Sequence, residues 1–166
     1  MSKRAKILAL FEQRTHPSLI ITKACSPPAD EDYHRRLRFW AIDCAHRAMH
    51  LLNDTPMALQ FSMTALGAAR NLAITSNVMP LITPDYDMLL AEVKRTAFAP
   101  QAEARLAAAF TVHHNVFLGA LGAATHARKA IHNADLRNNP EPDTKELQWQ
   151  AGRLKEWLVQ DITFDQ

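Results

Sequence analysis

The stretch from Asp30 to Leu52 constrains the fold more than any other part of the sequence. Its apolar side chains fall within one arc when successive residues are turned by about 100°, the rotation of an α-helix. This apolar stripe consists of Leu37, Trp40, Ala41, Cys44, Ala48, Leu51 and Leu52. Acidic residues fill the first turn, where they suit the positive end of the helix dipole. The pattern predicts an amphipathic helix that must bury this stripe against other helices.

Prolines and capping residues mark where further helices begin. The Thr-Pro pair at 55–56 and the Thr-Pro-Asp sequence at 83–85 are strong signals for the first turn of a helix. With the apolar periodicity, they predict helices at 3–14, 30–52, 56–74, 84–97, 99–134 and 144–160. The segment 15–29 contains a His-Pro and a Pro-Pro pair, so we expect an extended linker there. We expect a loop at 75–83.

Composition supports a helical fold. The 166 residues include only 4 glycines, and no stretch alternates between apolar and polar residues as a β-strand would. A chain of this length is the size of one ordinary domain. We therefore predict an all-α fold, a single domain over 1–166 built as a bundle of about six helices, with its core formed by 30–160.

The charge balance argues against a nucleic-acid partner. Nineteen basic residues against 17 acidic ones give a net charge of +2, and the basic residues are scattered. The acidic residues Asp85, Asp87 and Glu92 could form one acidic face on the helix at 84–97. The favoured interpretation of this face is a solvated helix N-terminus.

Cysteine usage and hydropathy indicate a cytoplasmic protein without a membrane partner. Cys25 and Cys44 form neither a CxxC pair nor a zinc spacing, and secreted small domains usually carry more cysteine. No apolar run reaches the ~18 residues that a membrane span requires. Cys44 lies inside the apolar stripe, so we expect an inert buried thiol and not a nucleophile. Gly119 and Gly122 could bend the helix at 99–134 or let another helix approach closely.

The histidines offer the main alternative chemistry. Asp43, His46 and His50 have the spacing i, i+3, i+7, which places them together on the face opposite the apolar stripe. With His113 and His126 they could complete the ligand set of a metal-dependent bundle enzyme. However, the chain lacks the two Glu-x-x-His pairs that a di-iron bundle needs, and it has no HExxH motif. We therefore favour a chain with no metal, no cofactor and no catalytic residue.

Three strings resemble the Imm5-like family of bacterial immunity proteins. They are the Leu-Arg-Phe-Trp-Ala-Ile-Asp-Cys-Ala string at 37–45, the Ala-rich string at 121–130 and the Glu-Leu-Gln-Trp-Gln-Ala-Gly-Arg-Leu string at 146–154. They follow one another in the family's order between about residues 35 and 158. The residues that match the family pattern are Trp40, Asp43, Cys44 and Trp149.

The resemblance implies a protein that binds and silences a cognate toxin in the bacterial cytoplasm. Such an immunity protein needs no catalysis, only a rigid surface of about 800 Å² that fits its partner. Two alternatives remain open at this point. One is the metal-dependent enzyme described above, and the other is a helical scaffold or oligomerisation module, which would include a homodimer.

Overall fold

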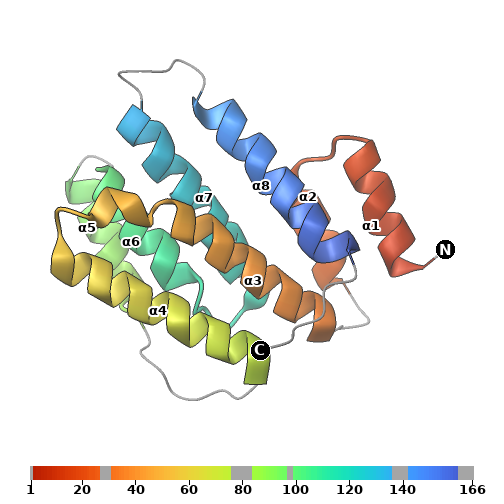
Figure 1. Cartoon of the computed structure of the whole chain (residues 1–166), viewed down its shortest axis with the longest axis horizontal. Coiled ribbons are helices and arrows are strands. Elements are labelled where there is room, and N and C mark those ends of the chain that lie inside the picture. The colour runs from red at the N-terminus through yellow and green to blue at the C-terminus, as the bar shows by residue number, and fades with distance from the viewer. Residues whose placement is uncertain (1, 27–30, 76–83, 97–98, 136–141, 161–166) are drawn as a thin grey trace.

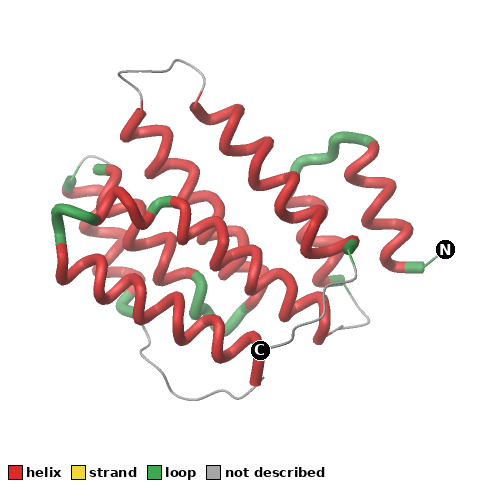
Figure 2. The backbone as a smooth tube through the Cα atoms, viewed as in Figure 1, coloured by secondary structure: helices red, strands yellow, loops and turns green. Residues whose placement is uncertain are grey.

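The computed structural model describes residues 2–26, 31–75, 84–96, 99–135 and 142–160 of the chain. This described part contains eight α-helices, one 3₁₀ helix and no β-strand (Figures 1 and 2). The helices are α1 (Lys3–Glu12), α2 (Pro17–Cys25), α3 (Glu31–Arg47), α4 (Pro56–Thr75), α5 (Tyr86–Arg95), α6 (Pro100–Phe110), α7 (Val116–Asp135) and α8 (Pro142–Val159). The 3₁₀ helix η1 spans Met49–Leu52. The all-α bundle is confirmed, but about six helices was too few.

The first of the two additional helices is α2, so the expected linker at 15–29 is wrong over most of its length. Pro17 occupies the first turn of α2, where its missing N–H leaves no bond unmade. The Nδ1 atom of His16 accepts a hydrogen bond from the Ser18 N–H at 3.3 Å and caps the helix. Ile20 and Ile21 are completely buried, so the core begins well before residue 30. The Pro-Pro pair at 27–28 lies outside the described residues.

The second additional helix arises because the expected helix at 99–134 is two helices. α6 ends at Phe110, and α7 begins at Val116 and packs against α6. The Thr111 hydroxyl donates a hydrogen bond to the Ala108 carbonyl at 2.7 Å, and the Asn115 side chain caps α7. These side-chain bonds to the backbone replace helical ones and end the helix.

Gly119 and Gly122 mark the close packing of these two helices. A Cβ atom at Gly122 would lie less than 3 Å from ring atoms of Phe110, and one at Gly119 would lie 2.8 Å from the Phe110 carbonyl oxygen. The glycines therefore let the end of α6 approach α7, as the second interpretation expected, and the helix break lies before them.

Smaller differences concern helix ends. The helix expected to reach Leu52 ends as an α-helix at Arg47 and continues as η1. At α5 the capping residue is Asp85, whose carboxylate accepts a hydrogen bond from the Met88 N–H at 2.9 Å. Pro84 therefore precedes the helix. Thr75 belongs to α4, and the rest of the loop expected at 75–83 lies outside the described residues.

α3 lies at the centre of the bundle, between α4 on one side and α7 and α8 on the other (Figure 1). Trp40 on α3 is only 1% exposed, and its indole N–H donates to the backbone carbonyl of Gln150 on α8 at 3.0 Å. α1 and α2 extend the core at the far side of α8. In the described part of the chain, no helix is long and apolar enough to cross a membrane.

Candidate functional site

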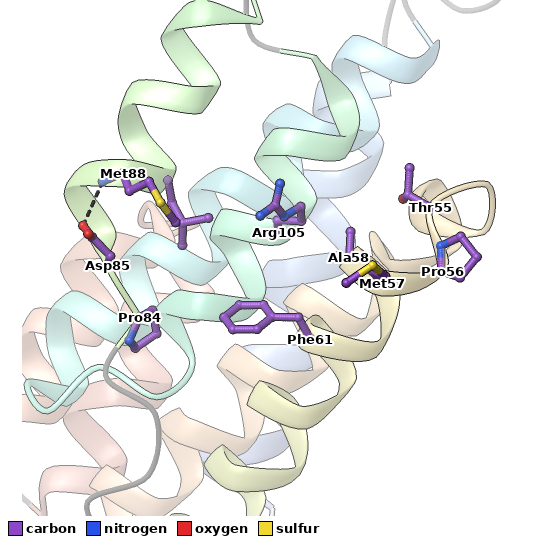
Figure 3. Close-up of a pocket in the computed structure, with 10 residues that line it drawn as sticks. Thr55, Pro56, Met57, Ala58, Phe61, Pro84, Asp85, Met88 and Arg105 are labelled. Carbon is purple, nitrogen blue, oxygen red and sulfur yellow. Dashed lines mark hydrogen bonds between the residues drawn. The ribbon is translucent and has the colours of Figure 1, made fainter.

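The described surface contains an apolar groove of about 620 Å³ (Figure 3). The N-terminal ends of α4 and α5 form its two walls, and α6 contributes Arg105 between them. The groove is lined by Thr55, Pro56, Met57, Ala58, Phe61, Pro84, Asp85, Met88, Leu89 and Arg105.

Two methionine side chains on the walls of this groove are exposed to solvent. Met57 on α4 is 87% exposed and Met88 on α5 is 58% exposed. Between them, Phe61 extends from α4 across the groove (Figure 3). Methionine and phenylalanine are enriched in the centres of protein interfaces, and methionine adapts its shape to varied partners. Exposed apolar surface in a concavity is typical of a binding site for another protein or an apolar ligand.

The charged groups of the groove are already engaged within the chain. The Arg105 guanidinium pairs with the Glu92 carboxylate at 2.5 Å, and Asp85 caps α5. Two of the three residues of the expected acidic face, Asp85 and Glu92, therefore have local structural roles. The remaining lining is mostly apolar, so a partner would be held here mainly by the burial of apolar surface.

The residues of the family pattern lie together at the contact of α3 with α8. The Arg153 guanidinium on α8 pairs with Asp43 on α3 at 2.7 Å and with Glu156 at 2.5 Å. The Trp157 indole N–H donates to the same Asp43 oxygen at 2.6 Å. Burial alone would lower the pKa of Arg153, but its hydrogen bonds to the two carboxylates raise it above the usual value. Arg153 is therefore a permanent cation that joins the two helices.

A second ion pair at this contact involves a buried carboxylate. Glu146 is 2% exposed and pairs with Arg47 at 3.0 Å. Desolvation by burial raises the pKa of Glu146, although Arg47 and the Gln150 side chain act in the opposite direction. The Arg47 guanidinium also lies over the ring of Trp149, 4.1 Å from its centroid. Trp149 thus adds a cation–π contact to the Arg47 cation of this ion pair.

Cys44 is completely buried, as expected from its place in the apolar stripe. Burial, followed by the nearby negative charges of Glu146 and Asp43, raises the pKa of its thiol well above the usual range. A protonated thiol without solvent access is not a nucleophile. Cys44 therefore serves packing.

The proposed metal ligands do not come together. Asp43 is bonded to Arg153 and Trp157, His46 is exposed, and the Nδ1 atom of His50 lies 2.8 Å from the Arg47 carbonyl oxygen. No group of three or more His, Cys, Asp and Glu side chains that could hold a metal ion occurs within the described ranges.

The other two proposed ligands lie beside Phe110 at the α6–α7 contact. The ring centroids of His113 and His126 are 6.1 and 5.3 Å from that of Phe110. The Nδ1 atom of His126 is 2.6 Å from Glu103, a completely buried carboxylate on α6. His126 therefore has a structural partner.

The sequence patterns predicted neither the groove nor the ion pairs described above. A charged residue inside an Ala-rich stretch, such as Glu103, was a usable signal for a buried pair. The exposure of Met57 had no such signal, because an apolar residue at a helix start is usually assigned to the core.

Comparisons with known proteins give no match. No family model matches the sequence, no curated protein matches it, and no solved structure matches the fold. The resemblance to the Imm5-like family therefore rests on the three strings at 37–45, 121–130 and 146–154.

Proposed function

We propose that this protein is a bacterial immunity protein that binds a cognate toxin in the cytoplasm and blocks it without catalysis. The observation that carries the proposal is the apolar groove, with Met57 and Met88 exposed on its two walls. When a partner covers an apolar surface of this kind, the free energy falls, and the complex is stabilised. The resemblance to the Imm5-like family supplies the identity of the partner as a toxin.

The charge of the chain is consistent with contact through apolar surface. A net charge of +2 gives little long-range attraction for a basic nuclease. We therefore expect a toxin whose contact surface is apolar and which inserts a side chain or a helix between α4 and α5. The complex should depend only weakly on salt.

Co-expression with the product of the neighbouring gene tests the proposal. The chain should rescue the cells and co-purify with that product as a one-to-one complex. The double variant Met57→Lys/Met88→Lys should lose both properties, because it places two cations in an apolar contact. Both side chains are exposed, so the variant should fold normally, which circular dichroism checks.

A matched control replaces an exposed leucine elsewhere. Leu19 on α2 is 55% exposed and does not line the groove, so Leu19→Lys should retain rescue and complex formation. If the wild-type chain neither rescues the cells nor forms a complex, the immunity function is wrong. If the double variant is as active as the control, the groove is not the contact surface.

A further inference from the structure

A second concavity, of about 480 Å³, lies between α3 and α8 and shares no lining residue with the apolar groove. We call it the α3–α8 cleft. It is lined by Asp43, His46, Arg47, Trp149, Gly152, Arg153 and Glu156. Because the lining contains both carboxylates and guanidiniums, the pairing of these groups determines which charge the cleft favours.

The pairing leaves an excess of negative charge at one end of the cleft. At one end, Arg47 and Glu146 form a one-to-one pair, which is neutral. At the other end, the single cation of Arg153 is shared by two carboxylates, Asp43 and Glu156. This second group therefore has one negative charge that no cation within it balances.

Both carboxylates at this end also have a free oxygen. Arg153 and Trp157 bond to Oδ2 of Asp43, and Arg153 bonds to Oε2 of Glu156. Oδ1 of Asp43 and Oε1 of Glu156 accept no hydrogen bond from the residues that the structure describes. The two side chains are 29% and 44% exposed, so a ligand can reach them.

Gly152 lines the cleft without a side chain that would occupy it. A Cβ atom at this position would meet nothing within 4 Å, in contrast to Gly122, where it would meet Phe110. The open space lies one helical turn from Trp149, whose partly exposed ring contacts Arg47 and also lines the cleft. The cleft therefore joins a place for an alkyl chain to a place for a cation.

We propose that the α3–α8 cleft binds the side chain of an arginine or lysine residue of a partner protein. Its methylene groups would lie over Gly152 and against Trp149, and its cationic end would donate charge-assisted hydrogen bonds to Asp43 and Glu156. The site shares with the proposed function the premise that the chain binds a protein. It does not depend on the apolar groove or on the identity of the partner.

The test titrates the ¹⁵N-labelled full chain with N-acetyl-arginine methylamide and follows the Gly152 amide and Trp149 indole signals by NMR. We expect saturable shifts with a Kd on the order of 1–10 mM. The affinity should fall several-fold in about 0.5 M salt, because added ions screen the exposed carboxylates. N-acetyl-lysine methylamide should bind at the same signals, and the uncharged norleucine analogue should not.

Substitutions locate the site. Gly152→Leu fills the cleft and should abolish the shifts of Trp149, while Glu156→Gln should weaken binding several-fold. Gly67→Leu is the matched control, since Gly67 is also an exposed helical glycine with open space around it, on α4. It should bind the probe like the wild type.

Three results would overturn the proposal. They are the absence of saturable shifts up to about 50 mM arginine probe, equal binding of the uncharged norleucine analogue, and unchanged binding by Gly152→Leu. Met57→Lys/Met88→Lys should leave the titration unchanged. Failure of the groove and failure of the cleft are therefore distinguishable.

Discussion

Substitution of alanine for Gly122 provides the sharpest test of how α6 packs on α7. The new methyl group would lie less than 3 Å from the ring of Phe110. That ring cannot move freely, because it stacks on His126 with centroids 5.3 Å apart and contacts Tyr86 at 5.2 Å. The ring also packs against both buried apolar clusters of the core. Gly122→Ala should therefore force the two helices apart or displace the ring from its stack.

Two opposing effects determine the magnitude. Alanine is favoured over glycine inside a helix by about 1 kcal/mol. Overpacking costs about 1–3 kcal/mol, and the close overlap with Phe110 places the cost near the upper end of this range. We expect a net loss of about 2 kcal/mol in the free energy of unfolding, or about 4–8 °C in Tm for a chain of this size.

Gly67→Ala is the control, because it gains the same helix propensity without any overlap. It should raise Tm by about 2–4 °C. Thermal and urea unfolding followed by circular dichroism measure both variants. In a Phe110→Ala background, Gly122→Ala should no longer destabilise, since the obstructing ring is gone. If Gly122→Ala stabilises the wild-type chain as much as Gly67→Ala does, the packing described for Phe110 is wrong.

Two further predictions concern buried polar groups. His126→Ala should lower the free energy of unfolding, measured in urea, by about 3 kcal/mol, because it leaves the buried Glu103 carboxylate without its partner. The double variant Glu103→Leu/His126→Leu removes both groups and should lie within about 1 kcal/mol of the wild type. Similar losses for both variants would contradict this reasoning. Burial raises the pKa of the Tyr86 hydroxyl, which donates to the Ala109 carbonyl at 3.0 Å, from its usual 10 to about 12. The folded state thus favours the neutral phenol. The contribution of Tyr86 to the free energy of unfolding is therefore complete below pH 10 and should be lost between about pH 10 and 12, as the phenol ionises. In a pH series of urea unfolding, the free energy of unfolding of Tyr86→Phe should fall less steeply over this interval than that of the wild type. Parallel curves would exclude this role of Tyr86.

Local patterns were sufficient to predict the all-helical class and most of the helices. The apolar stripe around Trp40 and Cys44 identified the buried face of α3, and both residues are buried there. The cap and proline at the start of α4 located its first residue correctly. These predictions succeed because helix periodicity and capping depend on residues three or four positions apart, which the sequence shows directly.

Local reasoning was wrong where a side chain's environment depends on distant helices. Pro17 was interpreted as a break, although it begins a helix whose burial depends on contacts with α7 and α8. Asp43, His46 and His50 had plausible ligand spacing along one predicted helix, but spacing within one helix does not determine which helices face each other. Asp43 therefore pairs with Arg153, 110 residues away, and not with a histidine.

The sequence by itself determined the secondary-structure class and the buried face of the central helix, because both follow from the spacing of apolar side chains along the chain. Only the tertiary structure decided which surfaces remain open. Met57 is 87% exposed beside a groove because of how α4, α5 and α6 are placed against each other. Gly152 borders a cleft because of how α3 and α8 are placed against each other. That placement follows from the combined packing of all helices, which no single segment of the sequence encodes.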